Sequence, residues 1–487
     1  MTKSTDRKYL KLLLVIGAIF TPPLVFFGAG LSQASALSIF TTIIILWFTE
    51  LLPLPVTGLL VPVLATLYGI LPTADAFKEF GNPILFLFIG AFLLAQALHK
   101  YKWDQRMAYF ILASKVGKAS PATLISIIGL ICWTLSMWIS NTATCAMMTP
   151  LCLGIAEIYN SRFKSEKEKN NFTTRILLTC AFSSSIGGLA TPIGSPPNLI
   201  AISFLSEAGI QINFFEWMLL ATPVALLMFL ILVVILELLF PIKIAASNQV
   251  KEFFKDQYQA LGPLTREEIQ VALVFTFTVV FWILPGIVEQ AGLSELYTTL
   301  RLDRLSMNLV GLIGGLSLFL LPSSSSSKDL TNLTWNDAKK IDWGTLMLFG
   351  GGLTLGAVLN DSGLAKEIGS LIFSGDNSFI YLLFASTVIG VLMSEFASNT
   401  ASASVVIPIV IASVAGISEN YLWFLVAAVA FGASYGFMLP VSTPPNAIVF
   451  GTGKLKIKDL IKAGIFFDIA GTISIVTYLY LCWIFFV

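Results

Sequence analysis

The chain has 487 residues, of which 56% are hydrophobic and only 12% are charged, whereas soluble proteins carry about 25% charged residues. Apolar runs of about 20 residues recur along it, which excludes an ordinary soluble domain and indicates an all-α polytopic membrane protein. The net charge of +1 points to no particular partner, and no nucleic acid is expected. All five cysteines lie in apolar segments, which predicts buried thiols, and His99 is the only histidine, which argues against histidine-based metal sites.

The predicted membrane segments follow one another with few polar interruptions. The first, at 12–30, follows four basic residues; a signal peptide is the alternative, but the length of the run favours a membrane helix. A polar stretch at 243–268 separates two halves, and a serine run at 323–327 is expected to be a flexible loop. The other predicted segments are 37–52, 54–71, 83–99, 121–159, 175–208 and 217–240, then 269–288, 307–321, 343–360, 379–414, 421–450 and 461–487.

Two copies of one polar motif interrupt these apolar segments. Ser-Asn-Thr occurs at 140–142, within 121–159, and again at 398–400, within 379–414. Asn and Ser favour helix ends over helix interiors, so each motif predicts a break between two half-helices. A membrane tolerates such a break only where it is buried in protein or lines a wet cavity. We therefore expect two re-entrant hairpins whose tips form a binding site, since each arm is short for a full crossing.

A second pair of motifs is Pro-Pro-Asn at 196–198 and 444–446. Proline lacks an amide hydrogen and breaks a helix, which frees upstream carbonyl groups to coordinate a cation such as Na⁺. A pair of simple helix kinks is the alternative interpretation. The order of landmarks supports an internal duplication, because Phe88, Ser140 and Ser195 are matched by similar strings 261, 258 and 248 residues later.

The placement of basic residues predicts the topology. With the N-terminus in the cytoplasm, 25 of the 29 Lys and Arg residues fall in inside segments, as the positive-inside rule requires. The ends of the first hairpin then lie inside and those of the second lie outside. The two repeats are therefore predicted to be inverted, an arrangement typical of secondary transporters.

On these paired motifs the chain resembles the divalent anion:sodium symporters, which include bacterial sodium-coupled dicarboxylate transporters. The resemblance covers most of the chain and implies about eleven transmembrane helices plus two re-entrant hairpins in an inverted repeat. It implies a homodimer in the bacterial plasma (inner) membrane that works by an elevator-type movement. The expected scaffold comprises 1–118 and, with a cytoplasmic connector, 243–376, and the expected transport domain comprises 119–242 and 377–487.

The resemblance also implies two sodium sites and one substrate site between the hairpin tips. The first sodium site would use Ser136, Ser140, Asn141 and Gly194, and the second would use Ser394, Ala397, Asn399, Ser442 and Pro444. The substrate would contact Asn141, Thr142, Ser195, Asn399, Thr400, Thr443 and Pro444. Neither hairpin core contains Lys, Arg or His, so bound Na⁺ is expected to supply the positive charge that a buried dianion requires.

The expected function is therefore sodium-coupled symport of C4-dicarboxylates such as succinate, malate and fumarate, and not catalysis. Sodium-independent dicarboxylate exchange of the 2-oxoglutarate/malate type, citrate or sulfate as the substrate, and a channel remain alternatives. A serine hydrolase is another, because 432–436 matches G-x-S-x-G. The only histidine lies at the end of a different span, so packing of small residues is the favoured interpretation of that motif.

Acidic residues inside membrane segments are candidates for function by default. Those in or beside the apolar runs are Glu50, Glu157, Glu237, Glu395 and Asp468. Glu395 adjoins the second hairpin tip. We expect it to bond to nearby backbone groups, and a role in proton coupling is the alternative.

Overall fold

The computed structural model describes residues 31–113, 120–160, 162–245, 247–324, 329–372, 378–414 and 419–486, together with residue 17. The expected first span at 12–30, apart from residue 17, and most of the serine run lie outside the described residues. The described part consists of helices, short turns and one isolated β-bridge. Eight of its helices are long and apolar enough to cross a membrane. The prediction of an all-α polytopic membrane protein is therefore confirmed.

The longer helices of the first half overlap the predicted segments, whereas the helices at 73–78 and 103–113 were not predicted and the one at 166–187 begins nine residues earlier than expected. An asparagine or serine side chain caps several of them; Asn82, for example, accepts from the amide of Ile84 at the start of α5. In chain order they are α2 (Leu31–Thr49), α3 (Leu54–Leu67), α4 (Thr73–Lys78), α5 (Pro83–Lys100), α6 (Trp103–Ala113), α7 (Pro121–Ser136), α8 (Asn141–Asn160), α9 (Glu166–Gly187), α10 (Pro196–Glu207) and α11 (Phe214–Leu239).

The second half begins after α12 (Asn248–Ala260), a helix within the stretch that was predicted only to be polar. Val250 and Phe254 lie one turn apart on α12 and are buried, so a narrow apolar stripe holds this helix against the bundle. The remaining helices are α13 (Arg266–Gln290), α14 (Ser294–Thr299), α15 (Met307–Ser317), α16 (Trp335–Ala338), α17 (Trp343–Asp361), α18 (Leu364–Ile372), α19 (Phe379–Phe396), α20 (Asn399–Ser413), α21 (Glu419–Ala433), α22 (Pro444–Gly451) and α23 (Ile457–Phe486).

The helix breaks occur at the predicted motifs. Ser140 and Ser398 precede α8 and α20, and each hydroxyl oxygen accepts from a backbone amide three residues later at 3.2 Å. The serine of each Ser-Asn-Thr motif is thus the N-cap of a half-helix. The longer arms α8 and α19 could each cross a membrane by length and composition. Arm length therefore does not distinguish a hairpin from two spans, contrary to the expectation that both arms are short.

The two halves interlock through two close helix crossings, each of which pairs one helix of the first half with one of the second. α3 packs on α17, and α5 packs on α15. A Cβ atom on Gly351 would lie 2.2 Å from the carbonyl oxygen of Gly58, and one on Gly90 would lie 2.2 Å from that of Gly311. Only glycine allows backbones to approach this closely. Gly90 and Gly351 are 261 residues apart, the same offset as the Phe88 landmark, so the crossings follow the internal repeat.

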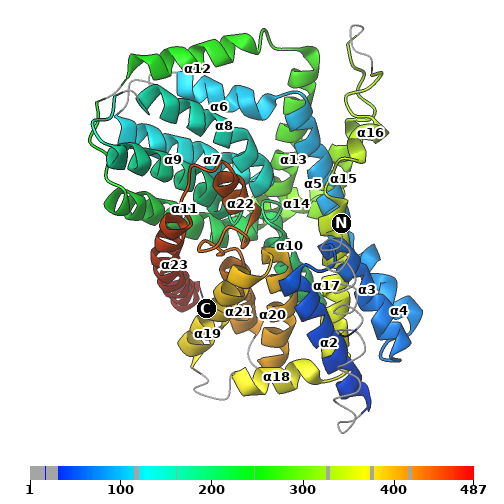
Figure 1. Cartoon of the computed structure of the whole chain (residues 1–487). Coiled ribbons are helices and arrows are strands. Elements are labelled where there is room, and N and C mark those ends of the chain that lie inside the picture. Colours follow the sequence, from blue (N-terminus) through cyan, green and yellow to red (C-terminus); the bar gives the residue numbers. More distant parts are fainter. Residues whose placement is uncertain are drawn as a thin grey trace, which may run out of the picture.

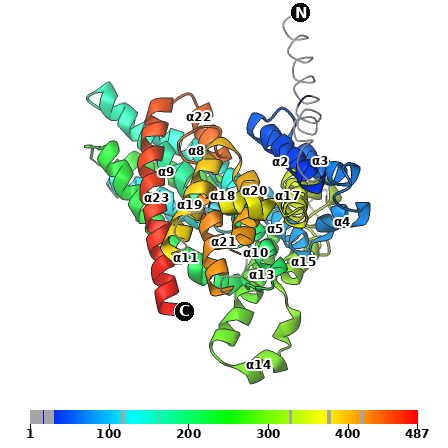
Figure 2. The same ribbon diagram turned by 90° about the horizontal axis from the view of Figure 1, so that it is seen from below.

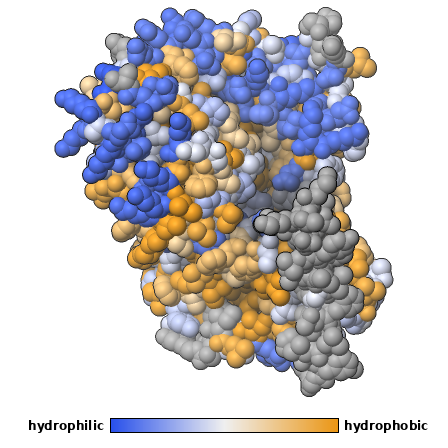
Figure 3. Space-filling view, in the orientation of Figure 1, coloured by the Kyte–Doolittle hydropathy of each residue, from blue (hydrophilic) through white to orange (hydrophobic). Residues whose placement is uncertain are grey.

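The hairpins and broken helices form a second group, beside the crossed helices (Figures 1 and 2). Within it, α22 packs on α8 and α10 packs on α20, so each half again contacts the other. Figure 1 places α6 and α12 at one end of the molecule and α18 at the opposite end. Hydrophilic residues gather over the end that carries α6, α12 and α16 (Figure 3).

A buried ion pair fixes α6 to the connector between the halves. Arg106 Nε lies 3.0 Å from a carboxylate oxygen of Glu268, and the guanidinium group also donates to the carbonyl oxygens of Leu261 and Gly262. The side chains of Arg106 and Glu268 are 7% and 5% exposed. Because each of the three guanidinium nitrogens donates to an acceptor, burial of this charge is compensated.

Candidate functional site

One cavity of about 600 Å³ lies between the two hairpin tips and the two broken helices, a volume typical of small-molecule sites. All residues predicted to contact substrate line it: Asn141, Thr142, Ser195, Asn399, Thr400, Thr443 and Pro444. Five predicted sodium ligands also line it: Ser140, Asn141, Gly194, Asn399 and Pro444. The other four, Ser136, Ser394, Ala397 and Ser442, are buried outside its lining. The fold thus brings the candidate residues together, and their roles stay predictions.

The N-termini of two hairpin helices and of the two helices that follow the Pro-Pro breaks meet at this cavity. The first residues of α8, α10, α20 and α22 all belong to its lining. The N-terminus of a helix carries a partial positive charge, so it favours an anion. Free amide groups can add to this at α8 and α20, whereas α10 and α22 begin with two prolines that have no amide hydrogen. Ser195 adds a hydroxyl group that is 1% exposed and has no hydrogen-bond partner among the described residues. This arrangement can bind an anion without a basic side chain between the tips.

The first tip surrounds the Asn141 carboxamide with oxygen atoms. One end of this group lies 2.6 Å from Ser136 Oγ, 3.0 Å from the Ser184 carbonyl oxygen and 3.3 Å from the Gly194 carbonyl oxygen. Since the carbonyl oxygens can only accept, the carboxamide turns its NH₂ group toward them and donates. A cluster of neutral oxygens of this kind also suits a hard cation.

The second tip repeats the serine–asparagine contact. Ser394 Oγ lies 2.9 Å from Asn399 Oδ1 and 2.7 Å from the carbonyl oxygen of Ala433. The broken helix approaches closely, because a Cβ atom on Gly436 would lie 2.7 Å from the Ser394 carbonyl oxygen. The spacing from serine to asparagine is five residues in both tips, so the two candidate cation sites have the same local design.

The asparagines of the Pro-Pro-Asn motifs hold the unwound segments in place, a role that we did not predict. Asn198 Nδ2 donates to the carbonyl oxygens of Gly188 and Thr191 at 2.8 Å each. Asn446 Nδ2 donates to those of Gly436 and Leu439 at 3.1 Å each. Both asparagines are fully buried. An asparagine occupies the third position of both Pro-Pro-Asn motifs. This recurrence was the signal in the sequence that could have revealed the role.

The expectation that Glu395 bonds to the backbone is confirmed. One carboxylate oxygen accepts from the amide groups of Phe437 and Met438 at 2.6 and 2.9 Å, and the other accepts from Ser442 Oγ at 2.9 Å. Glu395 is fully buried, and these bonds satisfy both of its carboxyl oxygens. They also join the second tip to the unwound segment between α21 and α22.

Charged residues line the cavity only away from the tips. His99 comes from the last turn of α5, and Lys340 and Asp342 precede α17. None of the three was predicted, because they come from the helices expected to form the scaffold rather than from the hairpin motifs.

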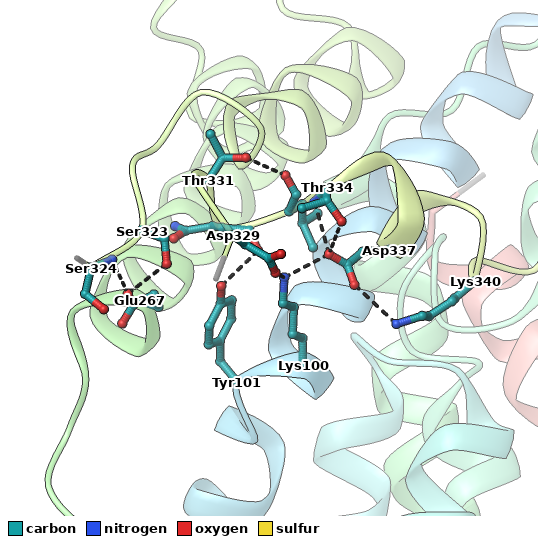
Figure 4. A network of polar contacts seen from close by, with 12 residues as sticks. Lys100, Tyr101, Glu267, Ser323, Ser324, Asp329, Thr331, Thr334, Asp337 and Lys340 are labelled. Atoms are coloured by element: carbon teal, nitrogen blue, oxygen red, sulfur yellow. Dashed lines mark hydrogen bonds and ion pairs between the residues drawn. The ribbon is translucent and has the colours of Figure 1, made fainter. Parts of the chain in front are cut away.

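A polar network holds the segment that carries Lys340 (Figure 4). Lys100 Nζ lies 2.9 Å from Asp329 and 2.8 Å from Asp337, and Asp337 also lies 3.4 Å from Lys340. Burial alone would raise the pKa of Asp337, but hydrogen bonds from Lys100 and Thr334 outweigh burial and hold the pKa at about 2. Asp337 is therefore ionised at neutral pH and fixes two basic side chains beside the cavity.

Comparison with known proteins shows similarity over almost the whole chain. A sequence profile described as the sodium:sulfate symporter transmembrane region matches residues 4–487. An uncharacterised transporter of Haemophilus influenzae is 35% identical over 92% of both chains. The sodium-dependent dicarboxylate transporters SdcS of Staphylococcus saprophyticus and Staphylococcus aureus are 30% and 31% identical over 89% of this chain and 83% of their own.

The fold also resembles a solved structure. MtrF of Neisseria gonorrhoeae, described as one of a class of antimetabolite efflux pumps, superposes with a TM-score of 0.52 over 82% of each chain. The two sequences are 12% identical, so this likeness concerns the fold alone. The profile match, by contrast, spans the described residues of both hairpins and both broken helices. The chain therefore belongs to the sodium:sulfate symporter family, the divalent anion:sodium symporters, and is a multi-pass membrane transporter that uses Na⁺ as its coupling ion.

Proposed function

We propose that this protein is a symporter that carries C4-dicarboxylates, such as succinate, malate and fumarate, with Na⁺ into the cytoplasm. The observation that carries the proposal is the meeting of four helix N-termini at one cavity whose tips contain no basic side chain. The SdcS relatives, named sodium-dependent dicarboxylate transporters, support this substrate class. A dianion in such a cavity needs positive charge from a source other than lysine or arginine, and co-bound Na⁺ supplies it.

Each tip contributes one sodium site and binds one carboxylate group of the substrate. The first sodium site uses Ser136, Ser140, Asn141 and Gly194, and the second uses Ser394, Ala397, Asn399, Ser442 and Pro444. When Na⁺ enters the first site, the Asn141 carboxamide turns over, so that its oxygen replaces its NH₂ group among the oxygens that surround it. Sodium thereby orders both tips before the substrate binds. One carboxylate of the dianion then lies at each tip, where Thr142, Ser195, Thr400 and Thr443 supply hydroxyl groups.

Transport proceeds by an elevator-type movement within a homodimer in the plasma membrane. The crossed glycine contacts favour a rigid scaffold in segments 1–118 and 243–376. The contacts of α8 with α22 and of α10 with α20 favour a single moving body in segments 119–242 and 377–487. With the N-terminus in the cytoplasm, His99 and Lys340 lie on the cytoplasmic side of the cavity.

The proposal is tested by uptake of radiolabelled succinate into liposomes that contain the purified protein. An inward Na⁺ gradient should drive uptake, and a matched K⁺ gradient should not. Asn141→Ala should abolish this uptake, while Asn160→Ala, at the other end of the same helix, should leave it unchanged. Both variants should elute as folded protein on size exclusion.

Other results would replace the proposal. Uptake without Na⁺ that depends on internal dicarboxylate would identify an exchanger. Sodium-driven uptake of sulfate or citrate without uptake of succinate would keep the coupling but overturn the substrate class. Full activity of Asn141→Ala would refute the assignment of the site.

A further inference from the structure

Asp468 is a buried acidic residue that the proposed mechanism does not use. It lies in the middle of α23, is 5% exposed, and neither of its carboxylate oxygens has a hydrogen-bond partner within the described residues. Gly464 and Gly471 lie on the same face of the helix. A Cβ atom on Gly464 would lie 2.6 Å from the backbone of Met438, and one on Gly471 would lie 2.2 Å from the ring of Tyr435. Asp468 therefore faces the unwound segment between α21 and α22.

Two further oxygen groups lie beside Asp468. Glu395 contacts the same segment, because its carboxylate accepts from the amides of Phe437 and Met438, and Met438 is the residue that Gly464 of α23 approaches. Glu395 accepts three hydrogen bonds in all, from these two backbone amides and from Ser442. The hydroxyl group of Tyr435 is also fully buried and has no partner in the described part of the chain. Three oxygen-bearing side chains thus collect behind the second tip, and two of them, Asp468 and Tyr435, have no hydrogen-bond partner among the described residues.

The two acidic side chains at this point have no basic partner in the described part of the protein, where no lysine, arginine or histidine forms an ion pair with Glu395 or Asp468. A buried carboxylate is costly unless a cation or a set of donors compensates it. Glu395 has three hydrogen-bond donors around it. Asp468 has none within the described residues, so Asp468 is the group that lacks a compensating partner.

The first repeat builds the same unwound segment without acids. At offsets of 258 and 248 residues, the counterparts of Glu395 and Asp468 are Met137 and Leu220. The amides of Leu189 and Ala190, which correspond to those that Glu395 accepts from, instead bond to carbonyl oxygens three residues earlier. The fold therefore does not require a carboxyl pair at this place, and the pair is specific to the second repeat.

We propose that Asp468 and Glu395, with the hydroxyl group of Tyr435, form a third Na⁺ site behind the second tip. This inference rests on the proposed sodium symport. A set of carboxylate and hydroxyl oxygens suits a hard cation, and Na⁺ is the coupling ion of the family. Three Na⁺ ions carried with one dianion would move one net positive charge, so the membrane potential would drive transport.

The test compares Asp468→Asn with Asp459→Asn, which lies near the start of the same helix. Both are measured by sodium-driven succinate uptake into liposomes with and without an inside-negative potassium diffusion potential. The potential should accelerate uptake by the parent protein and by Asp459→Asn. It should not accelerate uptake by Asp468→Asn, because two Na⁺ ions and one dianion carry no net charge. An equal response of Asp468→Asn and the parent, or no response of the parent, would overturn the third site.

A second measurement needs neither transport nor substrate. Na⁺ stabilises any protein that binds it in the folded state, and the dependence of the melting temperature on sodium concentration reports how many ions bind. Asp468→Asn and Tyr435→Phe should each show a weaker sodium dependence than the parent and Asp459→Asn. An unchanged dependence in both variants would overturn the site. Absence of succinate uptake by the parent would instead refute the proposed function, since this measurement uses Na⁺ alone.

Discussion

Replacing Gly188 by alanine should damage the first sodium site through a single added methyl group. The new Cβ atom would lie 2.3 Å from the Asn141 carboxamide oxygen position and 2.9 Å from the Gly194 carbonyl oxygen, whereas ordinary contacts begin at 3.4 Å. Gly188 has φ −60°, so alanine adopts its backbone conformation without strain. The effect must therefore come from displacement of the carboxamide by about 1 Å, together with a smaller shift of the Gly194 carbonyl group, and a displacement of this size in a functional site costs about 10²-fold.

The assay is the sodium dependence of succinate uptake in liposomes. The Na⁺ concentration for half-maximal uptake should rise about 10²-fold, equivalent to about 2.7 kcal/mol of binding free energy. Gly451→Ala is the matched control, because this glycine ends the helix of the other broken segment and a Cβ there meets no atom within 4 Å. A sodium dependence of Gly188→Ala equal to that of the parent would refute the assignment of these oxygens to a sodium site.

Three further changes test the packing around the site. Arg106→Ala should lower the free energy of unfolding by about 3–5 kcal/mol, because it leaves the Glu268 carboxylate buried without its partner. The double variant with Glu268→Gln should recover part of this loss in thermal melts. No recovery would contradict the ion-pair argument. Asn198→Ala should cost about 1–3 kcal/mol for each carbonyl group left unpaired and reduce uptake; unchanged melting and uptake would exclude its role as a clamp. Asp337→Asn should lower the melting temperature most above about pH 5, because a pKa of about 2 in the folded protein lies below the unfolded value of about 3.9. That difference should shrink as the pH falls from about 4 to 2, and a difference that does not change with pH would contradict it.

The sequence predicted the breaks well, because polar residues are conspicuous in apolar segments. Ser140 and Ser398 were expected to cap half-helices. The hydroxyl oxygen of a serine can accept a hydrogen bond from an unpaired backbone amide at the start of a helix, and such amides are absent from a helix interior. The proline motifs predicted the unwound segments for the same local reason. The meeting of both tips and both breaks at one cavity also followed from the repeat, since equivalent parts of an inverted duplication face each other.

Other features could not be read from local patterns. The carboxyl pair of Glu395 and Asp468 depends on which face of α23 packs on the unwound segment, and this is fixed by Gly464 and Gly471 rather than by the acids. Helix α12 was not predicted, because its apolar stripe is too narrow to stand out from the polar residues around it. The charged side chains beside the cavity come from helix ends that contact the site only after the two halves have packed together.

The crossed glycine contacts have a consequence for how this protein is assembled. Each crossing takes one helix from each half, α3 with α17 and α5 with α15, so neither half alone can bury its glycine face. When the first half leaves the ribosome, α3 and α5 do not yet have α17 and α15 to pack against. The first half must therefore remain in the bilayer with these glycine faces uncovered until the second half is made. The two halves thus behave as two complementary subunits joined by the polar segment 243–268. If the chain is divided within this segment and the two fragments are expressed together, each fragment keeps the helix faces that pack against the other.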